Sequence, residues 1–164
     1  MVNDRLDQTI QDIDPAASDI DLWVLLDQTR DAISRAREME LSQYKITKVQ
    51  ASVLFMLLTQ NGKVALSDIS RWILREPHSI SSLISRMEKN GLVRKIKETG
   101  DDRIQVQLTD KGRQIYSQIT WRSIEMVFSS LSTDEKLSLQ STLKKLRTKA
   151  RSLMGLDYKP PFLP

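Results

Sequence analysis

Apolar residues recur at helical spacing along most of the chain. The apolar positions stand three and four residues apart, as in helices that bury one face. No glycine- or proline-rich linker divides the chain, so we expect one domain over residues 18–153, preceded by a flexible arm over residues 1–17 and followed by a tail over 154–164. The pattern predicts helices over residues 18–41, 47–60, 67–74, 77–90, 110–131 and 133–153.

Polar residues mark where two of these helices begin. Thr47 with Gln50, and Ser132 with Glu135, have the spacing of a capping box, in which the hydroxyl and the longer side chain each bind a backbone N–H. The helix over 110–131 is expected to be long because its apolar line does not stop. That line comprises Ile115, Ile119, Met126, Val127 and Leu131.

The period changes from helical to alternating after Gly91. Ile104, Val106 and Leu108 alternate with glutamines, the pattern of a half-buried strand. The segments 92–97 and 104–109 therefore predict a short two-stranded hairpin. Its position after two closely spaced helices is the order of a winged helix-turn-helix, so the expected fold is mainly α with a small β-hairpin wing.

Composition removes several classes of protein. Of 164 residues, 40% are hydrophobic and 28% charged, which is typical of a globular domain. The chain has no cysteine and one histidine, which argues against disulfides, thiol chemistry, a metal site and a cofactor. The polar, acidic start does not resemble a signal peptide, and no stretch reaches the roughly 18 apolar residues of a membrane span. We therefore expect a cytoplasmic protein with no membrane partner.

Charge is divided unevenly along the chain. Residues 1–40 hold 4 Lys and Arg against 10 Asp and Glu, whereas residues 41–164 hold 21 against 11. An acidic front and a basic body favour a polyanion-binding surface in the body, although solvated faces account for the same asymmetry.

The helix over 77–90 has a polar face that suits double-stranded DNA. A helix of about 12 residues is about 18 Å long and fits a major groove. Hydroxyl and guanidinium groups bind base edges and phosphates, and hairpin cations neutralise phosphates. Each part also has a simpler explanation: a solvated serine face, basic protection of an edge strand, or a histidine that caps the helix. The candidate DNA-binding residues are His78, Ser79, Ser81, Ser82, Ser85, Arg86, Arg94, Lys95, Lys97 and Arg103.

Three motifs resemble the MarR family of bacterial transcription regulators. ITKVQASVLFML is similar to the family's LTxxQxxVLxxL helix, SSLISRMEKNGLVRK to its recognition helix and first wing strand, and VQLTDKG to its LTxKG motif. The resemblance follows the order of the elements over residues 20–153 and is dense over 46–116. Residues 71–93 also resemble a subgroup found in bacteria that respire organohalides.

The resemblance implies a homodimeric repressor that binds a near-palindromic operator. Residues 46–116 would form the DNA-binding lobe, and residues 18–44 and 117–153 the dimerisation helices. The leucine seam of the last helix, at alternating steps of four and three, agrees with packing along a partner. The wing departs from the family pattern, because Arg103 stands five rather than six residues before Leu108. The candidate dimerisation residues are Leu22, Leu139, Leu143, Leu146 and Leu153.

Many members of the family bind small aromatic anions or phenols, so the resemblance implies a small aromatic effector for this chain as well. The simpler explanation for each aromatic residue is a place in the core. The absence of cysteine excludes the thiol-sensing branch of the family. The candidate ligand-binding residues are Trp23, Tyr44, Met56, Trp72, Tyr116 and Trp121.

Two other functional classes compete with a DNA-binding regulator. A winged-helix adaptor that binds only protein is favoured by the acidic residues Glu98, Asp101 and Asp102 near the wing, but not by the basic hairpin. An enzyme is disfavoured, because the sequence has no nucleophile–base pair, no glycine-rich phosphate loop and no metal cluster.

Overall fold

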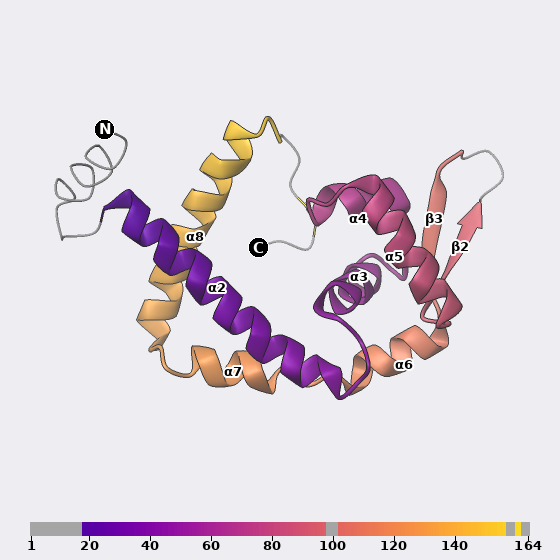
Figure 1. Cartoon of the computed structure of the whole chain (residues 1–164), viewed down its shortest axis with the longest axis horizontal. Helices are drawn as coiled ribbons and strands as arrows, with labels where there is room; N and C mark the ends of the chain where they lie inside the picture. Colours follow the sequence, from indigo (N-terminus) through magenta and orange to yellow (C-terminus); the bar gives the residue numbers. More distant parts are fainter. Residues whose placement is uncertain (1–17, 98–101, 157–159, 162–164) are drawn as a thin grey trace, which may run out of the picture.

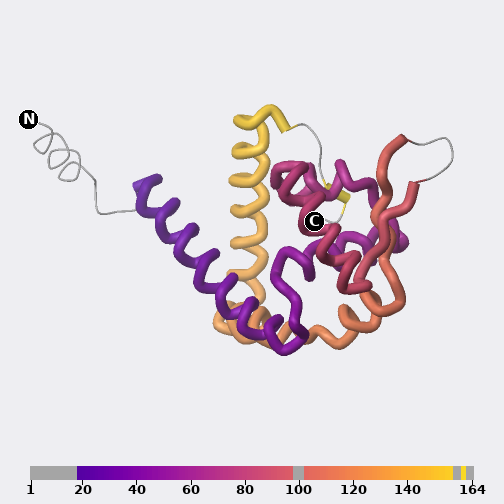
Figure 2. The backbone as a smooth tube through the Cα atoms, turned by 45° about the vertical axis from the view of Figure 1, so that its right-hand side comes forward, coloured from indigo at the N-terminus to yellow at the C-terminus, as the bar shows by residue number. Residues whose placement is uncertain are grey.

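The computed structural model describes residues 18–97, 102–156 and 160–161. The predicted arm over 1–17 and part of the hairpin tip lie outside the described residues. A lobe of short helices and a small sheet lies beside two long helices, α2 and α8 (Figure 1). A run of two shorter helices, α6 and α7, joins the lobe to α8 along one edge of the molecule (Figures 1 and 2).

The lobe carries the winged helix-turn-helix that the sequence predicts. Its sheet is antiparallel with strand order β1-β3-β2, and Val93 pairs with Leu108 across the wing hairpin. In chain order the elements of the lobe are α3 (Lys48–Thr59), β1 (Lys63–Ala65), α4 (Leu66–Trp72), α5 (Pro77–Lys89), β2 (Val93–Lys97), β3 (Ile104–Leu108) and α6 (Asp110–Gln118).

Three further helices form the long arms. The elements are α2 (Asp19–Ser42), α7 (Arg122–Phe128) and α8 (Thr133–Leu153). The C-terminal half of α2 packs against α7, while α2 and α8 cross near their middles in the view of Figure 1. Much of both long helices is therefore exposed to solvent in the single chain.

The core sits in the lobe and is centred on α3. Leu54 and Leu57 of α3 are fully buried and meet Ile69 of α4, Ile84 of α5 and Val106 of β3. By contrast, α8 contains no buried residue. The apolar pattern of the lobe is thus satisfied within one chain, whereas that of α8 is not.

Helix ends follow the predicted signals. Both capping boxes form: Thr47 and Ser132 accept the N–H groups of Gln50 and Glu135, which bind back to the caps. Gly91 adopts φ +72° directly after α5, a conformation that glycine tolerates best.

The prediction of one long helix over 110–131 is wrong, because the chain breaks after Gln118. Ile119 is extended, with φ −68° and ψ 121°, and α7 begins only at Arg122. The apolar line continues across the break, so periodicity did not reveal it. The cause is polar: side chains of α2 bind the backbone of residues 120–123, and the two shorter helices meet at that point.

Two further features differ from the expectation. The three-residue strand β1 pairs with β3 and adds a third strand to the predicted hairpin. Three residues are too few for alternation to signal a strand. In the predicted tail, Pro160 is fully buried.

Candidate nucleic-acid interface

Helix α5 separates an anchoring face from a polar face. Ile80, Leu83, Ile84 and Met87 are buried against the lobe, as their spacing predicts. Thirteen residues make the helix about 20 Å long, which suits a major groove. Of the DNA-binding candidates on this helix, the exposed side chains are His78, Ser79, Ser82 and Arg86, and the half-buried ones are Ser81 and Ser85.

His78 does not cap α5. The N-cap is Glu76, which makes no side-chain capping bond, and Pro77 occupies the first turn. His78 therefore lies one residue inside the helix with its ring exposed. The capping explanation from the sequence is wrong because the helix begins at Pro77, two residues earlier than a cap at His78 requires.

Polar contacts fasten the wing to α5. The Lys95 ammonium donates to Ser85 Oγ over 2.7 Å, and the Lys95 backbone N–H donates to Glu88 Oε1 over 2.7 Å. Ser85 Oγ in turn donates to the carbonyl of Ser81 over 2.9 Å. Ser85 and Lys95 are thus committed to each other and fix the angle between the wing and the helix, while Arg86 faces solvent.

The remaining wing cations lie on the surface of the hairpin. Arg94 Nε donates to Gln107 Oε1 over 2.8 Å, which holds its guanidinium across the sheet. Lys97 lies 3.9 Å from Asp102, and both side chains are exposed, so this ion pair contributes little. Arg103 is exposed one residue before β3. Arg94, Lys97 and Arg103 are thus exposed cations of the wing, and the wing strand β2 packs against α5.

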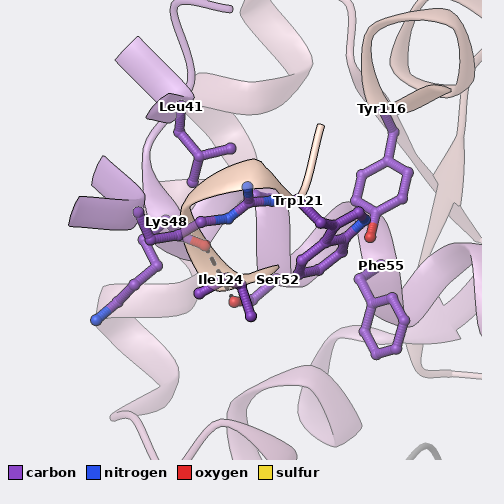
Figure 3. A pocket seen from close by; sticks show the side chains of 9 residues that line it. Leu41, Lys48, Ser52, Phe55, Tyr116, Trp121 and Ile124 are labelled. Carbon is purple, nitrogen blue, oxygen red and sulfur yellow. Dashed lines mark hydrogen bonds between the residues drawn. The ribbon is translucent and has the colours of Figure 1, made fainter. Parts of the chain in front are cut away.

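A small cavity lies between the arms and the lobe. Its volume is about 160 Å³, close to that of cavities that admit a single aromatic ring. Phe55, Tyr116 and Trp121 gather around it in Figure 3. The cavity is lined by Arg37, Leu41, Lys48, Ala51, Ser52, Phe55, Tyr116, Trp121 and Ile124.

Only two of the six predicted ligand-binding residues line this cavity, Tyr116 and Trp121. Trp23 is exposed on α2, and Met56 is buried in the core. Trp72 lines a separate, open groove beside the sheet. Tyr44 is engaged in the connection between the arms and the lobe.

The sequence analysis missed most of the cavity wall. Lys48, Ala51, Ser52 and Phe55 stand at i, i+3, i+4 and i+7 of α3, so they share one helix face. That spacing was a usable signal, but it does not reveal which neighbouring helices complete the cavity. Arg37 comes from α2, and nothing in its sequence neighbourhood indicates its partners.

Arg37 in the cavity wall belongs to a buried ion pair. Arg37 Nη1 lies 2.7 Å from Glu40 Oε2, and the two side chains are 7% and 9% exposed. The Arg37 guanidinium carbon stands 4.3 Å from the centroid of the Trp121 ring, within cation–π distance. Arg37 therefore combines a charge, an aromatic contact and a place in the cavity wall.

The pKa values of Glu40 and Tyr116 are shifted, and opposing effects act on each. Burial raises the pKa of Glu40, but hydrogen bonds from Ser123, Thr120 and Arg37 outweigh burial and lower the pKa to about 2. Burial also raises the pKa of Tyr116, while the Arg37 charge opposes that rise. At neutral pH Glu40 is ionised, and the Tyr116 hydroxyl keeps its proton to donate.

The predicted dimerisation residues are all exposed to solvent in the single chain. Leu22 near the start of α2 is 52% exposed, and Leu143 in the middle of α8 is 38% exposed. Leu139, Leu146 and Leu153 are also exposed. Together they make an apolar surface on both long helices.

The fold and these surfaces define a winged helix-turn-helix protein. Residues 46–104 match the model of the MarR family, and this match confirms the resemblance read from the motifs. Over these residues the chain is similar to the MarR family, and this similarity supports regulation of transcription through DNA binding.

Two curated relatives are transcriptional regulators by name. The chain is 25% identical over 157 residues to the HTH-type transcriptional regulator TtmR of Methylorubrum extorquens, with 94% of this chain and 80% of the relative covered. It is 30% identical over 93 residues to the HTH-type transcriptional regulator FarR of Neisseria gonorrhoeae, with 56% and 63% covered. The family match and these relatives point to regulation rather than to catalysis.

Solved structures share the whole arrangement. The organohalide sensing RdhR-CbdbA1625 transcriptional regulator in its 2,4-dichlorophenol bound form superposes with a TM-score of 0.81 at 28% identity, covering 93% of this chain and 94% of that one. A mutant form of MarR from E. coli, complexed with operator DNA, gives a TM-score of 0.72 at 21% identity, covering 77% and 94%, which supports the fold alone.

Neither a membrane-spanning helix nor a metal-binding cluster occurs among the described residues. None of the helices described is both long and apolar enough to cross a membrane. Within the same residues, no group of three histidine, aspartate or glutamate side chains could hold a metal ion.

Proposed function

We propose that the protein is a homodimeric repressor that binds a near-palindromic operator and is released by a small aromatic ligand. The observation that carries DNA binding is the exposed polar face of α5, with its hydroxyls and Arg86, next to a wing that carries the exposed cations Arg94, Lys97 and Arg103. The buried face of the same helix is anchored in the core, so the polar face is held rigidly outward. Rigid presentation favours readout of base edges.

The dimer is supported by the exposed apolar residues of α2 and α8. A soluble chain rarely leaves leucines exposed along two long helices unless another surface covers them. The two helices project from the same side of the lobe (Figure 2). A second copy with interlocking helices would cover both and place two α5 helices on successive turns of DNA.

The effector is proposed from the cavity and from one structural relative. Apolar walls with Arg37 at one end and the Tyr116 hydroxyl nearby suit an aromatic ring that carries a phenolic or anionic oxygen. The organohalide sensing relative is bound to 2,4-dichlorophenol, which has this chemistry. We therefore propose a phenol-like ligand for this chain, at the interface between arms and lobe.

DNA binding is tested with a fluorescently labelled duplex from the region upstream of the protein's own gene. Fluorescence anisotropy should rise saturably with protein and stay low with a duplex of shuffled sequence. Absence of saturable binding would overturn the DNA-binding surface and would favour the adaptor class. A footprint with two protected half-sites on one face of the helix supports the dimeric arrangement.

Release is tested by adding 2,4-dichlorophenol to the protein–DNA complex. We expect anisotropy to fall as the phenol is added, and Tyr116→Phe or Phe55→Ala to weaken the response. Cyclohexanol, which lacks the aromatic ring, serves as a control ligand. Unchanged binding at saturating phenol would overturn the choice of this ligand while leaving DNA binding intact.

A further inference from the structure

Two short segments connect the lobe to the long helices, and the structure brings them together. One runs from α2 to α3 over residues 43–47, and the other from α6 to α7 over residues 119–121. The Tyr44 hydroxyl in the first segment accepts the backbone N–H of Thr120 in the second over 3.3 Å. The same hydroxyl lies 3.5 Å from Thr120 Oγ1. Both connections are thus fastened at one point.

The carboxylate of Glu40, near the C-terminal end of α2, binds at the same place. Its Oε1 accepts the backbone N–H of Arg122 over 2.9 Å and the hydroxyl of Thr120. Its Oε2 accepts the backbone N–H of Ser123 over 3.2 Å and the Ser123 hydroxyl. One carboxylate therefore satisfies the free N–H groups at the start of α7, which a helix otherwise leaves unpaired.

Arg37 completes the cluster and joins it to the cavity. Its Nη1 donates to Glu40 Oε2 over 2.7 Å and to the carbonyl of Thr120 over 2.5 Å. Its guanidinium also faces the Trp121 ring, and Arg37 and Trp121 both line the cavity, whereas Glu40 does not. Glu40 thus acts on the connection without touching the cavity.

We propose that Glu40 is the positioning residue that fixes the DNA-binding lobe relative to the long helices. It holds residues 120–123 to α2, beside the Tyr44 bond that joins the two connecting segments. The Glu40 clasp consists of Arg37, Glu40, Tyr44, Thr120 and Ser123. These residues come from α2, α7 and the two connections, and none lies on the DNA-facing surface. Only Tyr44 among them packs against the core. With the clasp closed, the direction of α5 is set by the long helices.

A fixed orientation of the lobe matters because a winged helix binds DNA only in one orientation. A lobe that swings freely spends only part of its time in the binding geometry, and its apparent affinity falls by that fraction. Arg37 belongs to both the clasp and the cavity wall, and its guanidinium faces the Trp121 ring, so a ligand in the cavity would contact a member of the clasp. The positioning role itself holds with the cavity empty and does not depend on the proposed effector.

Hydrogen exchange measured by mass spectrometry tests the clasp in the full-length protein. Glu40→Gln removes the charge and keeps the shape, and Thr120→Val removes only one hydroxyl from an exposed side chain. We expect the amides of residues 120–125 to exchange at least about tenfold faster in Glu40→Gln, and by a smaller factor in Thr120→Val. The amides of α3 report the stability of the whole fold, so they should accelerate only by the factor that the loss of unfolding free energy predicts, and by less than residues 120–125. Glu38→Gln, an exposed acid on the same helix, is the matched control.

The orientation of the lobe is a second readout, and it would not change if Glu40 only stabilised the fold. The chain has no cysteine, so Lys89→Cys on α5 and Lys145→Cys on α8 introduce the only two spin-label sites. Lys145 lies opposite Leu143 on α8, which keeps the label off the apolar seam. The labelled chain is diluted with excess unlabelled protein, so that distances within one chain are measured in either a monomer or a dimer.

We expect one narrow distance distribution for the otherwise unchanged protein and for Glu38→Gln, and a broader or shifted one for Glu40→Gln and Thr120→Val. The inference is overturned if both clasp variants keep the narrow distribution and the slow exchange at residues 120–125. It is equally overturned if residues 120–125 accelerate by no more than α3, since Glu40 then acts on the whole fold and not on the connection. Failure to bind DNA would reject the proposed function without touching this result.

Discussion

The lobe and the long helices contain similar shares of apolar residues but bury them differently. In the lobe, α3 buries Leu54 and Leu57 completely within one chain. In α8, Leu143 and Leu146 remain 38% and 52% exposed, and no residue is buried. The lobe therefore carries its own core, whereas the long helices present an apolar surface to another molecule. Stability and association are separable in this protein.

The largest effect is expected from a charge placed on the exposed seam. Leu143→Asp should convert a dimer to a monomer, because a carboxylate buried without a partner costs several kcal/mol in the interface. The lobe should stay folded, since Leu143 contributes nothing to its core. Light scattering measures the mass, and circular dichroism the helix content.

Lys145→Asp on the opposite face of α8 is the control and should remain dimeric. If both variants stay dimeric, the leucine seam of α8 does not face a partner. The exposed apolar residues of the long helices would then not be explained by dimerisation.

The stability of the protein should depend on pH through Glu40, which lies where the lobe meets the long helices. The folded-state pKa of about 2 lies below the unfolded value of 4.5, so Glu40 stabilises the fold fully above pH 4.5. This contribution is lost as pH falls towards 2. Glu40→Gln should therefore be less stable by about 3 kcal/mol at neutral pH, because it leaves Arg37 buried without a carboxylate.

Urea unfolding at one fixed protein concentration measures this difference across the acid range. The gap in unfolding free energy between the wild type and Glu40→Gln should narrow as pH falls from 4.5 towards 2. A gap that stays constant through that range would show that the carboxylate is not held ionised by its hydrogen bonds.

Inside the lobe, a single methyl group should disturb the packing of α6 on the wing. A Cβ on Gly112 would lie 2.1 Å from the carbonyl oxygen of Leu92 and 2.9 Å from Leu108 Cδ1, so the helix must move. Gly112→Ala should lower the unfolding free energy by about 2 kcal/mol. Thermal or urea unfolding is compared with Gln114→Ala on the exposed face of the same helix. Equal stabilities would contradict this close packing.

The smallest effect on the fold is expected at the DNA-facing surface. Arg86 is exposed on α5, so Arg86→Ala should leave stability unchanged and weaken operator binding by about 1–3 kcal/mol. Arg35→Ala, an exposed arginine on α2, is the control. Anisotropy titrations of both variants at one salt concentration make the comparison, and equal affinities would remove Arg86 from the binding surface.

Local signals in the sequence predicted the lobe well. The capping box at Thr47 and the apolar face of α5 depend on residues within a few positions of one another, and both are confirmed. The break between α6 and α7 could not be predicted, because Glu40 lies 80 residues before the Thr120 hydroxyl that it binds. The cavity was mostly missed for the same reason, since four helices contribute to its wall. The DNA-binding and dimerisation residues remain predictions.

The salt dependence of DNA binding tests the central claim most directly. A dimer that places Arg86, Arg94, Lys97 and Arg103 of each copy near phosphates has up to eight such contacts. If about half of them form, the logarithm of the binding constant should fall against the logarithm of salt concentration with a slope of about −4 or steeper. A slope near zero for the upstream duplex would contradict a phosphate-binding wing and helix, and with them the assignment of the lobe to DNA.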